Sequence, residues 1–132
     1  RLEVAPAPLR PGALELVAWL GERGIPMALV TSTRRSDAQL RLGALQERFA
    51  VCACGDEVQA RKPAPDLYML ALDRLQMDAA GCLALEDSFA GVESAAGAGL
   101  AVVTVPDLVT PPATPYRVDS LGTVLDAFKA LA

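Results

Sequence analysis

The chain has 132 residues, of which 52% are apolar and 21% are charged. That length and balance fit one globular domain with a substantial core. The net charge of −4 and the absence of a basic cluster argue against a nucleic-acid partner. No apolar run reaches the roughly 20 residues that a membrane span needs, so no membrane partner is expected. The absence of histidine excludes a histidine general base, a Ser-His-Asp triad and a histidine-ligated zinc site within the chain.

The three cysteines indicate the redox environment. Cys52, Cys54 and Cys82 are an odd number, and none of them belongs to a C-x-x-C pair. Buried free thiols in a reducing compartment are therefore favoured over a disulfide or a metal site. Because no signal peptide is visible at the start of the sequence, we expect a cytoplasmic protein.

Helix-like and strand-like segments alternate along the chain. Residues 1–11 hold three prolines and predict an irregular connector, and residues 106–115 predict a proline-rich surface loop. Amphipathic spacing predicts helices over residues 13–23, 36–49, 67–75, 88–96 and 121–131. Short apolar runs predict strands over residues 25–30, 51–54, 82–85 and 100–105, and a shorter one at 116–118. This alternation indicates a doubly wound α/β fold with a mainly parallel sheet.

Three groups of polar residues follow predicted strands or lie in a loop that leads to the next helix. Thr31-Ser32-Thr33 offers hydroxyls and amides at a helix N-terminus, which can bind an anion. Lys62 lies in a stiff loop with two prolines and supplies a point charge suited to a phosphate or a carboxylate. Glu86 and Asp87 end an apolar strand, where ligands bind in open α/β sheets. At about 4 Å and an effective dielectric of about 20 they repel by roughly 4 kcal/mol, which a divalent cation would relieve.

Each group taken alone also has a simpler explanation. Ordinary helix capping accounts for the hydroxyls, and a solvated surface position accounts for the lysine. A cap formed by Asp87 or Ser88, with Glu86 merely solvated, accounts for the acidic pair equally well. The three groups together favour a phosphoryl-transfer site, because such catalysis relies on positioning, charge neutralisation and a metal. Mg²⁺ prefers oxygen ligands and keeps several waters, so one or two carboxylates suffice to hold it.

The same residues resemble three motifs of one enzyme superfamily. Motifs II, III and IV of the haloacid dehalogenase (HAD) superfamily are similar to Val30-Thr31-Ser32, Arg61-Lys62-Pro63-Ala64-Pro65-Asp66 and Leu85-Glu86-Asp87-Ser88-Phe89-Ala90-Gly91. The similarity is with the branch that contains β-phosphoglucomutase and phosphoglycolate phosphatase, and it covers roughly residues 10–106. It implies a three-layer α/β/α, Rossmann-like core with a mainly parallel sheet.

The resemblance also implies a role for each matching residue. Thr31 would hydrogen-bond the transferring phosphoryl group with help from the Ser32 amide, and Lys62 would neutralise charge between the phosphate and the nucleophile. Thr31 and Lys62 are therefore the candidate catalytic residues, and Thr31, Ser32 and Lys62 the candidate phosphate-binding residues. Asp87 would bind Mg²⁺ directly, and Glu86 either directly or through water. The implied substrate is a small phosphorylated metabolite.

Motif I of the superfamily is missing. It is an Asp-x-Asp sequence that supplies the nucleophilic aspartate, and the chain holds no D-x-D. The helical cap domain of the superfamily is missing as well. We therefore expect residues 1–11 to be the linker that returns from the cap and residues 12–132 to be the C-terminal part of the HAD core. The motif I strand, which lies in the middle of the superfamily's sheet, would come from an N-terminal segment of the same protein.

The predicted function is Mg²⁺-dependent hydrolysis of a small phosphorylated metabolite through an aspartyl-phosphate. Without motif I, the chain alone is expected to be inactive. The alternative within enzymes is a phosphomutase of the same branch. The alternative from another class is a catalytically dead module that binds phosphate or regulates a partner. A receiver domain also places Asp, Thr and Lys around Mg²⁺, but there the acidic pair precedes the other two residues in the chain, which disfavours it.

Overall fold

Helices and parallel strands alternate in the structure, a computed structural model that describes residues 12–105, 116–117 and 129. The α-helices are α1 (Ala13–Glu22), α2 (Arg35–Leu42), α3 (Asp66–Leu75) and α4 (Phe89–Gly97). The strands are β1 (Ala28–Thr31), β2 (Val51–Cys54), β3 (Leu83–Glu86), β4 (Ala101–Thr104) and β5 (Tyr116–Arg117). Short 3₁₀ helices form η1 (Gly43–Arg48), η2 (Gly55–Glu57) and η3 (Ala79–Gly81). None of the helices placed in this part of the chain is long and apolar enough to cross a membrane.

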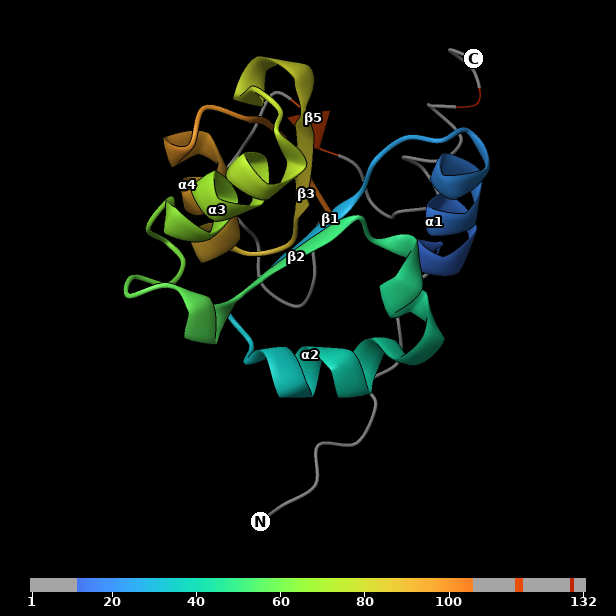
Figure 1. The fold of residues 1–132 in the computed structure, drawn as a ribbon. Helices are drawn as coiled ribbons and strands as arrows, with labels where there is room; N and C mark the ends of the chain where they lie inside the picture. Colours follow the sequence, from blue (N-terminus) through green and yellow to red (C-terminus); the bar gives the residue numbers. More distant parts are fainter. Residues whose placement is uncertain (1–11, 106–115, 118–128, 130–132) are drawn as a thin grey trace.

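The strands form two separate sheets (Figure 1). β1 pairs in parallel with β2, and β3 pairs in parallel with β4, whose other edge carries β5. Among the described strands, no hydrogen-bonded pairing joins β1 to β3. The sequence predicted that the middle strand of the sheet would be missing from this chain. The break in pairing lies between β1 and β3, the two strands that were expected to flank it.

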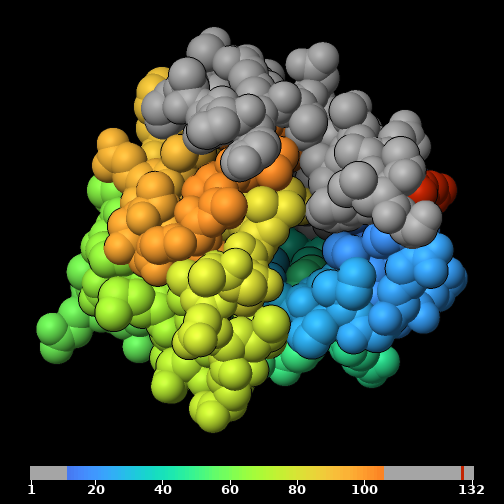
Figure 2. Space-filling view, turned by 90° about the horizontal axis from the view of Figure 1, so that it is seen from above, coloured from blue at the N-terminus to red at the C-terminus, as the bar shows by residue number. Residues whose placement is uncertain are grey.

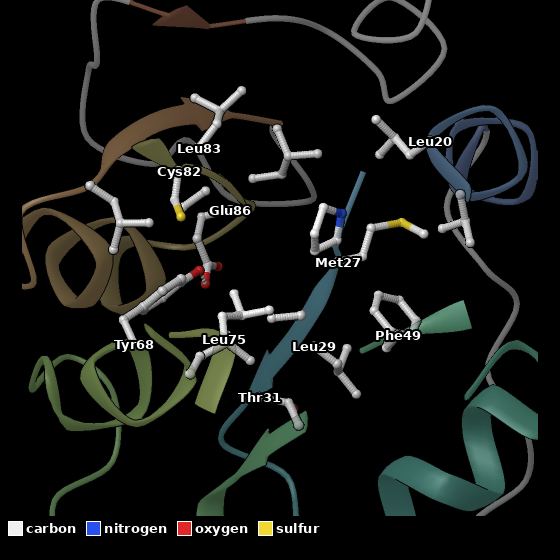
Figure 3. Close-up of a pocket in the computed structure, with 18 of the residues that line it drawn as sticks. Leu20, Met27, Leu29, Thr31, Phe49, Tyr68, Leu75, Cys82, Leu83 and Glu86 are labelled. Atoms are coloured by element: carbon white, nitrogen blue, oxygen red, sulfur yellow. Dashed lines mark hydrogen bonds between the residues drawn. The ribbon is translucent and has the colours of Figure 1, made fainter. Parts of the chain in front are cut away.

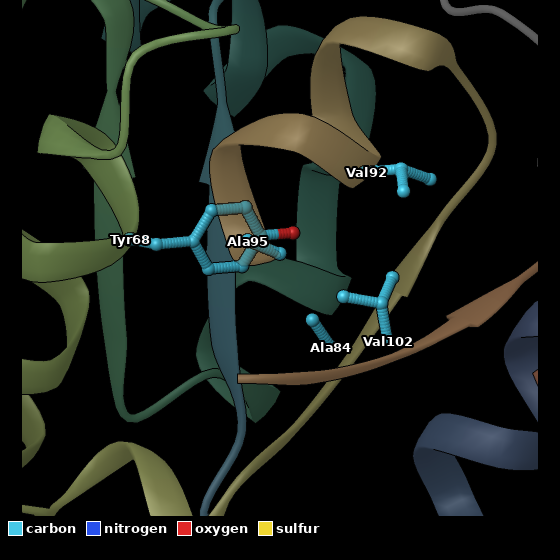
Figure 4. Packing of buried hydrophobic residues seen from close by; sticks show 5 residues of the cluster. All are labelled: Tyr68, Ala84, Val92, Ala95 and Val102. Atoms are coloured by element: carbon cyan, nitrogen blue, oxygen red, sulfur yellow. The ribbon is translucent and has the colours of Figure 1, made fainter. Parts of the chain in front are cut away.

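Helices cover both faces of the strands, which gives the three-layer α/β/α architecture that was predicted. On one face, α3 packs on β1 and β2, and α4 packs on β3 and β4. That interface buries a cluster formed by Tyr68, Ala84, Val92, Ala95 and Val102 (Figure 4). On the other face lies α1. Its residues Leu16 and Leu20 pack in a second cluster with Leu85 of β3, Val103 of β4 and Val105, which follows β4. Successive residues of a strand point to opposite faces, so β3 and β4 contribute to both cores.

One predicted helix is shorter than expected. The sequence predicted a continuous helix over residues 36–49, but α2 ends at Leu42 and a 3₁₀ helix follows. Gly43 has φ 54°, a backbone conformation that glycine adopts readily and that interrupts the helix.

The strand predicted over residues 25–30 begins only at Ala28, since Pro26 has no N–H to donate to a sheet. The predicted connector 1–11, the loop 106–115 and nearly all of the helix 121–131 lie outside the described residues.

Candidate active site

A buried ion pair links the lysine loop to the ends of both sheets. Lys62 Nζ donates to Glu86 Oε1 at 2.5 Å and to the backbone carbonyl of Val30 at 3.0 Å. The side chains of Lys62 and Glu86 are only 12% and 6% exposed. A pair this deeply buried is favourable only where its remaining polar atoms also find partners. Because Val30 belongs to β1 and Glu86 to β3, Lys62 connects the two sheets at the carboxyl ends of their strands.

Tyr68 completes the surroundings of this ion pair. Its hydroxyl donates to Glu86 Oε1 at 2.6 Å, and Figure 3 shows the Tyr68 side chain next to that of Glu86. The centroid of its ring lies 5.3 Å from Lys62 Nζ. Burial, together with the Glu86 carboxylate, raises the pKa of Tyr68 far above its usual value, so the phenol stays protonated and can donate. Sequence reasoning missed Tyr68, because a tyrosine in an amphipathic helix is usually a core residue. Its place in the first turn after the lysine loop was the available signal.

Glu86 lies directly against Gly91 of α4. A Cβ atom added at Gly91 would be 2.0 Å from Glu86 Oε2 and 2.7 Å from Oε1. No side chain fits there unless the carboxylate moves, so this close approach requires glycine. Glu86 is therefore buried and hydrogen-bonded, and the simpler explanation of a solvated Glu86 is wrong.

Ser88 caps α4. Its Oγ accepts a hydrogen bond from the Gly91 amide at 3.0 Å, which satisfies one of the unpaired N–H groups of the first helical turn. The capping explanation therefore holds for Ser88. Asp87 does not form the cap; it is half-buried and lines a cavity together with Glu86 and Lys62.

Thr31 ends β1 and begins the loop to α2. Its Oγ1 accepts a hydrogen bond from the Thr33 amide at 3.1 Å, and a hydroxyl that accepts one bond can still donate its own proton. The Ser32 carbonyl packs against Gly55, where an added Cβ would lie only 1.9 Å from the carbonyl oxygen. Both contacts fix the backbone of the loop that the sequence predicted to bind phosphate.

A cavity of about 710 Å³ lies between the two sheets. Thr31, Lys62, Glu86 and Asp87 line it at the carboxyl ends of β1 and β3, so the structure brings together four of the five predicted site residues. Ser32 is not among the residues that line the cavity. The rest of the wall is mostly apolar and comes chiefly from α1, β1, α3 and β3, with Phe49 after η1 also contributing (Figure 3). Figure 2 shows a hollow in the surface between the segment that carries α1 and the segment that carries β3.

The acidic residues fit a magnesium ion in part. Mg²⁺ takes oxygen ligands and is often held by one or two carboxylates and several waters. Glu86 Oε1 already accepts hydrogen bonds from Lys62 and Tyr68, so this oxygen has little capacity left for a metal ion. Within the described part of the chain, no group of three or more His, Cys, Asp or Glu residues could hold a metal ion. A magnesium site here would therefore need oxygen ligands beyond these two carboxylates.

Comparison with known proteins agrees with the motifs. The family model of haloacid dehalogenase-like hydrolases matches residues 1–99. The plasmid-encoded protein CbbY of Cupriavidus necator is 41% identical over 104 residues, which cover 75% of this chain and 41% of that protein. A phosphorylated carbohydrates phosphatase of Thermotoga maritima is 38% identical over 92 residues, covering 68% of this chain and 43% of that protein. The chain thus spans less than half the length of these two relatives.

Solved structures agree as well. A crystal structure of CbbY from Rhodobacter sphaeroides, in complex with xylulose-(1,5)bisphosphate, superimposes with a TM-score of 0.81 and 34% sequence identity. The superposition covers 86% of this chain and 55% of that one. With the family model matching most of its length and the fold matching as well, the chain belongs to the haloacid dehalogenase-like hydrolases.

Proposed function

We propose that the chain forms the phosphate-binding and metal-binding part of a Mg²⁺-dependent phosphatase that acts on a small phosphorylated sugar. The observation that carries this proposal is the shared cavity lined by Thr31, Lys62, Glu86 and Asp87. A hydroxyl, an ammonium group and carboxylates are the groups that phosphoryl transfer needs for positioning and charge neutralisation. The name of the Thermotoga maritima relative and the ligand of the Rhodobacter sphaeroides structure support a sugar phosphate as substrate.

Each residue has a distinct role in this proposal. Thr31 donates its hydroxyl proton to an oxygen of the transferring phosphoryl group, and the Ser32 amide donates to a second oxygen. Lys62 neutralises the charge of the phosphate. Two of its three N–H donors go to Val30 and Glu86 within the described residues, which leaves the third for a phosphate oxygen. Glu86 and Tyr68 hold this ammonium group in place.

Asp87 is the proposed direct ligand of Mg²⁺, and Glu86 acts chiefly as the partner of Lys62. When bound, the ion would neutralise negative charge on the phosphoryl oxygens. Asp87 directly follows β3, so its carboxylate is held at the mouth of the cavity by the same strand that positions Glu86. The ion and the phosphate would then lie at the same edge of the two sheets.

The proposal also requires a nucleophile, which we assign to an N-terminal segment of the same protein. Neither β1 nor β3 pairs with a described strand on the side that faces the cavity. An unpaired strand edge leaves N–H and C=O groups without partners, and an apolar wall next to it favours an apolar strand. A strand parallel to β1 and β3 in this position would end beside Thr31, Lys62 and Asp87. That is where an aspartate nucleophile is needed.

The test compares this chain with an extended protein, in which the polypeptide encoded upstream of Arg1 is included. We expect the extended protein to hydrolyse p-nitrophenyl phosphate with Mg²⁺ and to lose turnover in EDTA, while the chain alone has none. Turnover by the chain alone would contradict the proposal. An extended protein that binds phosphate without any turnover would favour a non-catalytic phosphate-binding module. An extended protein that interconverts sugar phosphates without releasing phosphate would favour a phosphomutase.

A further inference from the structure

We propose that the η2 turn, Gly55–Glu57, is a positioning element that sets the place of the 31–33 loop relative to Lys62. The effect of the turn on turnover rests on the proposed function, whereas its effect on the positions of the two loops does not. None of the three residues lines the cavity. The turn therefore acts on the site only through the segments that it contacts.

The first contact is with the 31–33 loop. The Gly55 amide donates to the Thr33 carbonyl at 2.8 Å, and Gly55 packs against the Ser32 carbonyl so closely that a Cβ would lie 1.9 Å from its oxygen. One residue further on, the Asp56 carboxylate accepts a hydrogen bond from the Arg35 amide at 3.0 Å, at the start of α2. The turn thus contacts both the 31–33 loop and the first residue of α2.

The second contact is with the loop that carries Lys62. Arg61 Nε donates to the Gly55 carbonyl at 3.2 Å, so the residue before Lys62 is bound to the turn. Lys62 itself donates to the Val30 carbonyl at 3.0 Å, next to Thr31. The backbone of Gly55 therefore bonds to both loops, through its N–H to Thr33 and through its C=O to Arg61. A shift of the turn moves the phosphate-binding loop and the lysine loop together.

Glu57 anchors the turn. Its carboxylate accepts hydrogen bonds from the Cys54 amide at 3.0 Å, from Arg35 at 2.7 Å and from Arg74 of α3 at 2.6 Å. Both arginines also donate to the carbonyl of Cys52 in β2. Hydrogen bonds from Arg74, from the Cys54 amide and from Arg35 lower the pKa of Glu57 to about 2 against the effect of its burial. One carboxylate thereby joins β2, α2 and α3 behind the site.

The test uses the extended protein and the variant Glu57→Gln, which keeps the shape of the side chain but removes its charge. Glu93→Gln is the matched control, because Glu93 is an exposed carboxylate on α4. Amide hydrogen exchange, followed by mass spectrometry, is measured over residues 31–35 and 61–66. We expect exchange at least about tenfold faster in both segments for Glu57→Gln and unchanged for Glu93→Gln, since the turn contacts both loops. Should Glu57→Gln fail to fold, Arg74→Met removes one of the two ion pairs of Glu57 and leaves the pair with Arg35 in place.

Kinetics with p-nitrophenyl phosphate provide the second readout. A displacement of about 1 Å can lower turnover about 100-fold, so we expect Glu57→Gln to lower kcat by about 10- to 100-fold with a much smaller change in KM. Faster exchange confined to the turn itself, or a kcat equal to that of the wild type, would overturn the inference. If the wild-type extended protein shows no turnover, the proposed function fails, and the exchange measurement alone decides whether the turn positions the two loops.

Discussion

The two sheets carry different halves of the candidate site and hold them by different means. The sheet of β1 and β2 ends in the hydroxyl and backbone groups of the 31–33 loop, which contacts the η2 turn through the backbone of Ser32 and Thr33. The sheet of β3, β4 and β5 ends in the carboxylates of Glu86 and Asp87, and Glu86 is fixed by side-chain contacts with Lys62 and Tyr68. The geometry of the first half therefore depends on the course of the main chain, and that of the second on charge pairing.

Each half contains one close contact with a glycine, and the two contacts differ in the same way: one is with the main chain and the other with a side chain. Gly55 packs against a backbone carbonyl, whereas Gly91 packs against the end of the Glu86 side chain. A backbone carbonyl cannot move without moving the whole loop, while a carboxylate can rotate away at the expense of its hydrogen bonds. Mutations in the two halves should therefore have different consequences.

The largest effect is expected for Asp87→Asn in the extended protein. Removing the charge of the proposed magnesium ligand should lower turnover of p-nitrophenyl phosphate by at least about 100-fold, because a bound metal supplies several kcal/mol of charge stabilisation. The variant Asp78→Asn is the control, since Asp78 is an exposed aspartate outside the cavity. It should keep wild-type rates. Near-normal turnover in Asp87→Asn would show that the metal ligand is assigned wrongly.

Gly91→Ala should come next. The new methyl group overlaps both oxygens of Glu86 and forces the carboxylate off Lys62 and Tyr68, so we expect the free energy of unfolding to fall by about 2–3 kcal/mol. Urea unfolding of this chain measures it, because in the extended protein the proposed strand would fill the cavity that Gly81 lines. At Gly81, nothing lies within 4 Å of an added Cβ, so Gly81→Ala should be neutral or slightly stabilising. Equal stabilities for the two alanine variants would contradict the close approach of Glu86 to Gly91.

Tyr68→Phe should have a smaller effect on the same half of the site. The variant keeps the ring next to Lys62 but removes a hydrogen bond to a carboxylate, which contributes about 1.5–2 kcal/mol when one partner is charged. A double-mutant cycle with Glu86→Gln, in urea unfolding at neutral pH, isolates this contact. A coupling free energy near zero would mean that the hydroxyl and the carboxylate do not interact.

The smallest effect is a dependence of stability on pH in the first half. The pKa of Glu57 is lowered from 4.5 to about 2, chiefly by the hydrogen bond from Arg74. The unfolded chain therefore binds this proton at a higher pH than the folded chain, so the stabilisation is complete above about pH 4.5 and is lost as the pH falls towards 2. Because Arg35 and Arg74 are about a third exposed, we expect only about 1 kcal/mol.

Unfolding midpoints between pH 6 and pH 2.5 measure this contribution. The stability difference between the wild type and Glu57→Gln should shrink as the pH is lowered. A difference that stays constant over this range would contradict the ionised state of Glu57. Glu93→Gln should remain parallel to the wild type throughout.

The sequence predicted the place of the site because strand ends can be located from local patterns. Thr31, Glu86 and Asp87 follow short apolar runs, and the carboxyl ends of parallel strands share one edge, so their proximity follows from the fold class. Lys62 was found from its stiff loop and its motif. The roles assigned to these residues remain predictions, although the cavity brings them together.

Contacts between distant segments could not be predicted in the same way. Tyr68 contacts Glu86, 18 residues away, and Glu57 contacts Arg74, 17 residues away. The local pattern reveals neither partner. Glu57 resembles a solvated glutamate, and the position of Tyr68 just after the lysine loop is the one local hint of its role. The end of α2 at Leu42 was missed for a different reason. The apolar spacing continues through Gly43, and only the positive φ of that glycine shows that the helix stops.

The most direct test of the central claim is the hydrogen exchange of the amides of β1 and β3, measured residue by residue by NMR. The claim is that a strand from an N-terminal segment fills the cavity between these two strands and completes the site. We predict that amides of β1 and β3 that exchange freely in this chain become strongly protected in the extended protein, because the added strand accepts their hydrogen bonds. Equal exchange in the two proteins would contradict the claim.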